Sequence, residues 1–213
     1  MSNIKVSVLV PVFNQEKLVI RALESIPKRD DIEIIVIDDG STDNTWNNLL
    51  NYRNAELPYR DIVLLYNKTN KGVSYTVNKG YDNANGEYIV LLGSDDYFYS
   101  KGFNKAMEQL DGTDFVFFQT TNNYGKVELN EHNKCGSFKF MRTEFMKDYR
   151  NDEKRVAGED YYLWKEILKA NPTIKELDIV VKHYNYPRKG SLNWELNNGA
   201  IDLESGERKC SCQ

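Results

Sequence analysis

Acidic residues follow two apolar stretches of the sequence at the point where each stretch ends. The stretch EIIVIDDGS contains Asp38 and Asp39, and the stretch YIVLLGSDD ends in Asp95 and Asp96. If both stretches are strands of one parallel sheet, their carboxyl ends lie along the same edge, where ligands of such sheets gather. We therefore expect two acidic sites close together.

Clustered carboxylates favour a divalent metal and, with it, a phosphate ligand. Adjacent carboxylates stay ionised together only beside a compensating cation, and oxygen-only ligand sets favour Mg²⁺ or Mn²⁺ over zinc. The sequence has neither a G-x-x-x-x-G-K-[ST] loop nor a G-x-G-x-x-G turn, so a metal would hold most of the phosphate. Turn formation and helix capping would explain one such acidic site, but two sites on one edge favour the metal.

The segments between these sites alternate between strand and helix patterns. Apolar runs predict strands, and apolar residues three and four apart predict helices. This alternation predicts an α/β fold with a doubly wound, mostly parallel sheet that has helices on both faces. Strands are expected at 5–12, 32–37, 62–66, 88–92 and 115–119, and helices at 16–26, 41–50 (capped by Ser41 and Thr42), 74–84 and 101–110.

The pattern changes after about residue 120. Residues 122–140 are expected to form loops with short strands, whereas 142–149 and 159–170 have helical patterns and 174–184 a strand pattern. The tail beyond Pro187 is polar and rich in Gly and Asn. We expect it to form a surface arm or a lid.

Composition disfavours several other classes of protein. The 213 residues include 28 Lys plus Arg and 32 Asp plus Glu, for a net charge of -4, and without a dense basic block nucleic-acid binding is not expected. No stretch reaches the ~18 apolar residues of a membrane span, and no secretory signal is recognisable. Three cysteines provide no disulfide or zinc framework. We expect a cytoplasmic protein, with peripheral membrane contact and oligomeric state left open.

Four segments together resemble a known enzyme family. VSVLVPVFNQEKLVIRALESI, IEIIVIDDGSTDNT, NKGVSYTVNKGYDNANGEYIVLLGSDD and GEDYYLW are similar, in order and spacing, to family 2 glycosyltransferases of the GT-A fold, over about residues 4–185. The resemblance implies inverting transfer of a sugar from a nucleotide diphosphate, usually UDP, to an acceptor hydroxyl with Mg²⁺ or Mn²⁺. The acceptor would be a glycan, a lipid-linked sugar or another hydroxyl compound. It also implies a domain 1–186, with a nucleotide-sugar half 1–120 and an acceptor half 121–186, followed by the arm 187–213.

The resemblance implies roles for individual residues as well. Asp95 matches the metal-ligand position of the D-x-D motif, with Asp96 beside it as a second candidate ligand, and Asp160 matches the general base of the E-D motif. Such a base takes the proton of the acceptor hydroxyl while the metal neutralises the departing diphosphate. The residues implied to contact the nucleotide sugar are Pro11, Phe13, Glu16, Asp39 (which would hydrogen-bond the base ring), Asn70, Gly72, Ser94 and Asp95.

The spacing around Asp160 agrees with this role. On a helix, Asp160 shares a face with Leu163, Trp164 and Ile167, whereas Glu159 lies on a more polar face. Asp160 is therefore the acid expected to point into the protein. The simpler alternative is that Asp160 only stabilises the helix N-terminus through the dipole.

Three further side chains have two interpretations each. Trp164 would suit stacking on a sugar ring but is more typical of a core residue. His183 would suit a third metal ligand but is more typical of a structural histidine. Arg188, ahead of the KGSLNW segment, is either a lid charge that closes over the diphosphate or a surface arginine.

The sequence departs from the family pattern at three positions. Gly93 replaces the first acid of D-x-D, Val77 stands where an arginine is common, and YNYP at 184–187 replaces a Tyr-Arg-x-His motif. Donor binding is thus expected to use fewer contacts, with Asp96 or Arg188 replacing some of them. A non-catalytic nucleotide-binding module is the second hypothesis. A nucleotidyltransferase is a third, disfavoured because PVFNQEK is not the Gly-rich and basic-rich loop that would hold a triphosphate.

Overall fold

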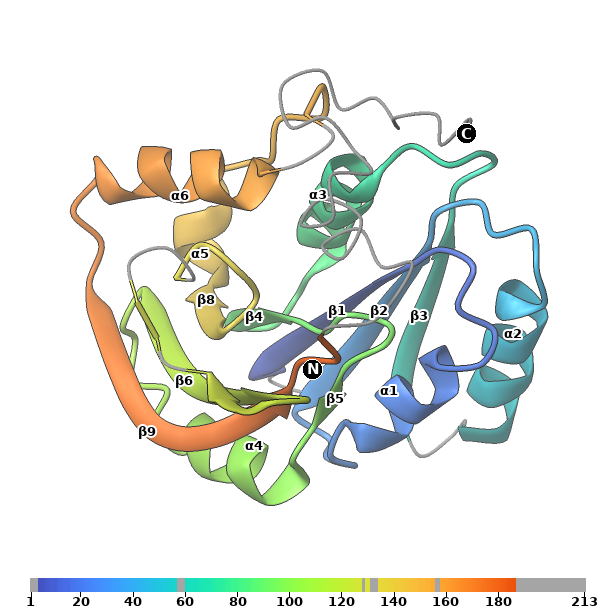
Figure 1. Cartoon of the computed structure of the whole chain (residues 1–213), viewed down its shortest axis with the longest axis horizontal. Coiled ribbons are helices and arrows are strands. Elements are labelled where there is room, and N and C mark those ends of the chain that lie inside the picture. The colour runs from blue at the N-terminus through green and yellow to red at the C-terminus, as the bar shows by residue number, and fades with distance from the viewer. Residues whose placement is uncertain (1–3, 57–59, 128, 131–133, 156–157, 187–213) are drawn as a thin grey trace.

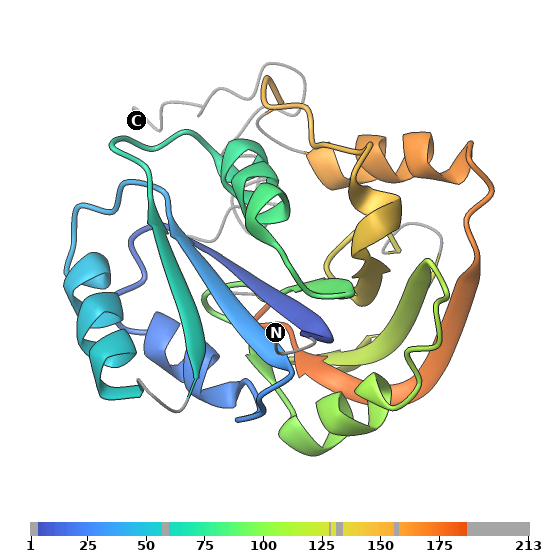
Figure 2. The ribbon, with the colours of Figure 1, turned by 180° about the vertical axis from the view of Figure 1, so that it is seen from behind.

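A strongly curled sheet runs through the middle of the molecule, and helices pack on both of its faces (Figure 1). The same layers are visible from behind in Figure 2. The structure, a computed structural model, describes residues 4–56, 60–127, 129–130, 134–155 and 158–186 of the chain. It confirms the predicted α/β sheet with helices on both faces.

The first half of the sheet is parallel. Its strands are β1 (Val6–Val12), β2 (Ile32–Asp38), β3 (Asp61–Tyr66) and β4 (Tyr88–Leu91). They lie in the order β3-β2-β1-β4, with Val12 beside Asp38 and Leu9 beside Leu91. The carboxyl ends of β1, β2 and β4 therefore reach the same edge, as the sequence predicted.

The second half continues the same sheet with mostly antiparallel pairings. Its strands are β5 (Tyr97–Phe98), β6 (Phe115–Asn122), β7 (Gly125–Val127), β8 (Lys139–Arg142) and β9 (Ile174–His183). Strand β8 lies antiparallel between β4 and β6, β9 runs parallel to β6, and β5 closes the edge against β9. This arrangement brings the end of β9 next to the turn that follows β4.

The helices agree with the predicted segments in type and order. They are α1 (Val19–Ser25), α2 (Thr45–Glu56), α3 (Val73–Asn83), α4 (Ser100–Met107), α5 (Thr143–Met146) and α6 (Glu159–Leu168). Helix α5 is a single turn where eight residues were expected. Within the residues described, no helix has the length and apolar character to cross a membrane.

The start of α2 differs from the prediction. Ser41 and Thr42 were expected to cap this helix, but its first residue is Thr45, whose N–H donates to the Asp43 carboxylate at 2.9 Å. The N–H of Ser41 donates instead to Asp38 at 2.9 Å. Asp38 and Asp43 thus accept two of the backbone N–H groups of this segment, and the helix starts closer to the C-terminus than predicted.

Two apolar clusters pack against opposite faces of the sheet. Val8 and Val10 of β1 join the cluster that includes residues of α1 and α4, whereas Leu9 joins the cluster that includes residues of α3 and α6. Alternate strand residues point to opposite faces, so both faces of β1 are covered. The second cluster adjoins the ligand edge, and the candidate site lies there.

Candidate active site

A cavity of about 310 Å³ brings together residues from both halves of the chain. Its lining includes four predicted site residues, which are Pro11, Asp95, Asp96 and Asp160. Residues from β4, α3, β8 and α6 complete the wall, so the cavity lies at the carboxyl edge of the parallel strands. The volume is at the lower end of the range for small-molecule sites.

Asp160 lies in the first turn of α6 and lines this cavity. One of its carboxylate oxygens accepts the N–H of Tyr161 at 2.8 Å. Glu159 lines the cavity too, which the helix spacing did not predict, and burial raises the pKa of its carboxyl group. Trp164 is a core residue, packed edge-on against Phe115 at 5.1 Å.

The turn after β4 holds its two acids differently. Asp95 lines the cavity, and the Asp96 carboxylate, 2% exposed, accepts the N–H of Asn185 at 2.9 Å and lies 3.3 Å from the Nζ atom of Lys182. Lys182 is fully buried. Burial raises the pKa of Asp96 and lowers that of Lys182, while their mutual attraction opposes both shifts. The internal cation that makes the adjacent carboxylates tolerable is therefore Lys182.

Gly93 leaves room for this arrangement. A Cβ atom at position 93 would lie 2.9 Å from Oδ2 of Asp96 and 3.3 Å from Oδ1 of Asp95. Contacts below 3.0 Å force a neighbour to move, and here the neighbour is held by Lys182. The carboxylate of Asp96 thus occupies part of the space that a side chain at position 93 would need.

Asp39 binds the loop that precedes α3. Its Oδ1 atom accepts from the Asn67 side chain at 2.9 Å and from the Lys71 N–H at 2.8 Å, and its Oδ2 atom accepts the Gly72 N–H at 2.9 Å. Asn70 supports the same turn by accepting the Gly72 N–H at 3.1 Å. A carboxylate has about four acceptor positions, so within the part of the chain that the structure describes one position on Oδ2 has no donor.

Gly40 is required for the approach of this loop, and its replacement by alanine is expected to be costly. Its φ is +73°, and a Cβ atom would lie 2.7 Å from the carbonyl carbon of Thr69. We expect G40A to lower the free energy of unfolding by about 1–3 kcal/mol, measured by urea denaturation. The matched control is G112A, because Gly112 has a φ of +97° with no atom near the added methyl group. Equal losses in both variants would contradict the close contact at Thr69.

The first loop is held against the start of α2. Glu16 accepts the Asn44 N–H at 3.0 Å, and its own N–H donates to Asp43 at 3.2 Å. Phe13 is 41% exposed, and Ser94 is buried. Phe13, Glu16 and Ser94 are not among the residues that line the cavity, whereas Pro11 is.

His183 is a structural residue. Its Nδ1 atom lies 3.0 Å from the Thr121 hydroxyl oxygen, its Nε2 atom lies 3.1 Å from the side-chain oxygen of Asn123, and its ring stacks on Tyr97. Both ring nitrogens have partners, which favours the structural interpretation over metal ligation. Arg188 lies outside the described residues.

The family model "Glycosyl transferase family 2" matches residues 7–162. The chain belongs to glycosyl transferase family 2. One relative is the Escherichia coli enzyme WfaP, which is named as a UDP-Glc:α-D-GlcNAc-diphosphoundecaprenol β-1,3-glucosyltransferase. It is 30% identical to this chain over 197 residues, and the match covers 84% of this chain and 76% of the relative. A second relative is an uncharacterised glycosyltransferase of Rickettsia felis, which is 34% identical to this chain over 132 residues. That match covers 61% of this chain but only 20% of the relative, so the chain spans about a fifth of that protein's length.

Solved glycosyltransferases share the fold. The S. aureus TarS fragment 1–349 in complex with UDP is similar with a TM-score of 0.73 and 25% identity, over 85% of this chain and 60% of that one. A mannosyltransferase from Pyrobaculum calidifontis in complex with GDP-Man and Mn²⁺ has a TM-score of 0.71 at 18% identity, over 92% of this chain and 61% of that one. These similarities confirm the predicted GT-A fold.

The acidic residues of this family 2 glycosyltransferase suit a metal with few protein ligands. In the part of the chain that the structure describes, no three Asp, Glu, His or Cys side chains gather closely enough to hold a metal. Asp95 borders the cavity, whereas the carboxylate of Asp96 binds Lys182 and Asn185. This donor set fits Mg²⁺ or Mn²⁺ that takes most of its ligands from phosphate and water.

Sequence reasoning missed one wall of the glycosyltransferase cavity. Lys139, 5% exposed, donates to the carbonyl oxygens of Lys134, Cys135 and Gly136 at 2.8, 2.8 and 2.6 Å. Burial lowers its pKa to about 8. Lys182 donates to the Ser137 hydroxyl at 2.6 Å. Two buried lysines thus fix the segment 134–137, and the strand that carries Lys139 has only four residues, too few for a recognisable sequence pattern.

Proposed function

We propose that this chain catalyses metal-dependent, inverting transfer of a sugar from a UDP-sugar to an acceptor hydroxyl. The observation that carries the proposal is that Asp95 and Asp160, from opposite halves of the chain, line one cavity of about 310 Å³. Support comes from TarS, which has been solved with UDP and with UDP-GlcNAc. The Mn²⁺ in the Pyrobaculum enzyme supports a divalent ion.

In this proposal Asp160 and Asp95 have different chemical roles. Asp160 takes the proton of the acceptor hydroxyl as that oxygen bonds to the anomeric carbon, and the bond from that carbon to the diphosphate oxygen breaks on the opposite face. Asp95 would hold a divalent ion, and such an ion would supply positive charge against the departing diphosphate. Asp96 keeps Asp95 in place through the turn that Lys182 anchors.

The donor base would bind at Asp39. The remaining acceptor position on its Oδ2 atom suits the ring N–H of uracil, and the three donors already present fix the orientation of the carboxylate. Phe13 is 41% exposed on the same edge and offers an aromatic face. The predicted contacts of Glu16, Asn70, Gly72 and Ser94 belong to the same proposal, in which these residues shape the loops around the nucleotide.

The acceptor would enter along an apolar wall beside Asp160. Tyr81, Met141, Met146 and Leu163 line the cavity together with Asp160. Such a wall suits the apolar face of a sugar ring. Two relatives are named for acceptors linked to undecaprenol diphosphate, one of Campylobacter jejuni and one of Escherichia coli. We therefore propose a lipid-linked or polymeric glycan acceptor and peripheral contact with a membrane.

Binding of UDP is expected to require a divalent metal and Asp95. Calorimetric titration should detect UDP binding with Mn²⁺ and much weaker binding with EDTA. D95N should weaken the Mn²⁺-dependent affinity more than about tenfold, or about 1.4 kcal/mol. D61N is the control, since Asp61 is exposed at the far end of β3. If no nucleoside diphosphate binds in a metal-dependent way, the proposed function is wrong.

A non-catalytic nucleotide-binding module is the second candidate. The arrangement at Gly93 favours it, because Asp96 occupies the space of the missing acid and is held by Lys182. Slow Mn²⁺-dependent hydrolysis of a UDP-sugar, with water in place of the acceptor, separates the two candidates. Metal-dependent UDP binding without any hydrolysis would favour the module.

A further inference from the structure

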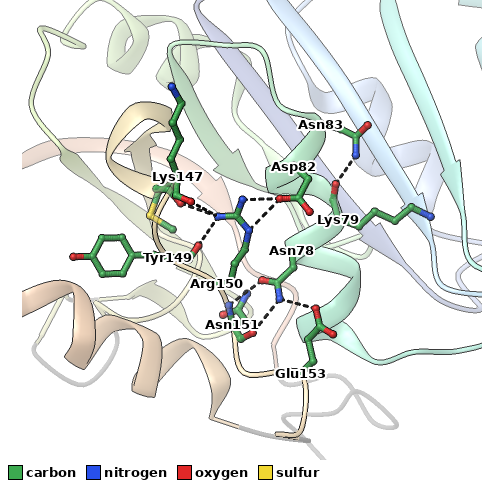
Figure 3. A network of polar contacts seen from close by, with 10 residues as sticks. Asn78, Lys79, Asp82, Asn83, Lys147, Tyr149, Arg150, Asn151 and Glu153 are labelled. Atoms are coloured by element: carbon green, nitrogen blue, oxygen red, sulfur yellow. Dashed lines mark hydrogen bonds and ion pairs between the residues drawn. The ribbon is translucent and has the colours of Figure 1, made fainter.

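A buried asparagine on α3 joins the two halves of the cavity. Asn78, 5% exposed, lies in the middle of the helix, where asparagine is a poor helix former. Its Oδ1 atom accepts the N–H of Asn151 at 2.9 Å, and its Nδ2 atom donates to the carbonyl oxygen of Asn151 and to a Glu153 carboxylate oxygen, both at 3.0 Å (Figure 3). One side chain thus pairs with both backbone groups of one residue in the other half.

The segment that receives these bonds has little regular structure of its own. Residues 150–155 form neither a helix nor a strand, so their buried backbone groups need partners from elsewhere. Asn151 is 7% exposed. Without Asn78, both of its backbone groups would lose those partners inside the protein.

A second anchor lies one turn further along α3. Arg150 donates to Asp82 at 2.6 and 3.1 Å, and to the carbonyl oxygens of Met146, Lys147 and Tyr149 at 2.9, 3.1 and 2.7 Å (Figure 3). Asp82 is four residues after Asn78, so the two side chains share one face of the helix. This face of α3 therefore binds two adjacent residues of the segment, Arg150 through Asp82 and Asn151 through Asn78.

The anchored segment leads to the proposed base. Met146, Asn151 and Asp160 line one cavity together with Val77 and Tyr81 of α3. At its start, α3 is bound to Asp39 through the N–H of Gly72. The helix therefore connects the proposed base-binding acid to the segment that precedes the proposed catalytic acid.

We infer that Asn78 is a positioning residue, whose carboxamide sets the place of the acceptor-side wall and of Asp160 relative to the bound donor. This inference rests on the proposed function. It explains why a buried amide occupies this helix position. Asn78 acts through Asn151 and touches no reacting atom.

The variant N78D tests the inference with a minimal change of shape. One carboxylate oxygen still accepts the Asn151 N–H, but the other faces the Asn151 carbonyl oxygen and the Glu153 carboxylate, where the native amide donates at 3.0 Å. We expect Mn²⁺-dependent hydrolysis of UDP-glucose or UDP-GlcNAc to fall more than about tenfold, while UDP affinity stays within about twofold. Hydrogen exchange should increase in residues 147–155 and not in β1 or β2.

Adding E153Q to N78D supplies a donor to the new carboxylate and should restore much of the hydrolysis and exchange protection, while E153Q alone should remain near wild type. The matched control is N83D, the same change at an exposed position of α3. If N78D does not fold, D82N loosens only the exposed second anchor and should raise exchange in the same segment. Normal hydrolysis and exchange in N78D, or equal losses of hydrolysis and UDP affinity, would overturn the inference. Absence of UDP binding in the wild type would instead overturn the proposed function.

Discussion

Replacing Asp160 by asparagine is expected to abolish sugar transfer while UDP binding stays nearly intact. The amide has the shape of the carboxylate and still accepts the Tyr161 N–H, a bond of 2.8 Å in the native protein. It cannot take a proton from the acceptor hydroxyl, so the rate should fall by about 10²–10⁴. The measurement compares Mn²⁺-dependent UDP release from a UDP-sugar with the calorimetric affinity for UDP.

The neighbouring acid provides the control for this assignment. Glu159 lines the same cavity, and burial raises the pKa of its carboxyl group, so E159Q makes the same chemical change one residue away. We expect E159Q to keep most of the activity. If E159Q is inactive and D160N active, the base is Glu159, and if D160N no longer binds UDP, Asp160 serves the donor rather than the acceptor.

The parts of this site that lie at strand ends were predictable from the sequence. Continuous apolar runs identified β1, β2 and β4, and their parallel arrangement placed Asp39 and Asp95 on one edge. Helical spacing alone placed Trp164 in the core and Asp160 on the inner face of α6. In each case the information is local, because it is the spacing of residues within one element and the short loop that follows it.

The contacts between the halves were not predictable in this way. Strand β8 inserts between β4 and β6, and β5 has only two residues, so neither has a periodic pattern long enough to recognise. Lys182 reaches Asp96, and Asn78 reaches Asn151, across long stretches of chain. Such pairs depend on the sheet order, which hydrophobic periodicity does not encode.

The second large effect is expected in the stability of the variant K182M. Methionine fills a similar space but leaves the Asp96 carboxylate, 2% exposed, without its cation and Ser137 without its donor. Breaking one partner of a buried ion pair costs about 3–5 kcal/mol. We therefore expect a loss of this size in the free energy of unfolding, measured by urea denaturation at neutral pH.

The double variant D96N/K182M separates an uncompensated charge from lost packing. The amide oxygen at position 96 still accepts the Asn185 N–H, a bond of 2.9 Å in the native protein, and neither member of the former ion pair carries a charge. Because the large cost of breaking such a pair is the unpaired charge, the double variant should be more stable than K182M, with a coupling energy of about 1–3 kcal/mol. Additive losses would mean that Lys182 acts through Ser137 and through the rings of Phe138 and Tyr184, whose centroids lie 5.1 and 6.0 Å from its Nζ atom. In that case the 93–96 turn would need another cation to hold two adjacent carboxylates, and the divalent ion of the donor complex would be that cation.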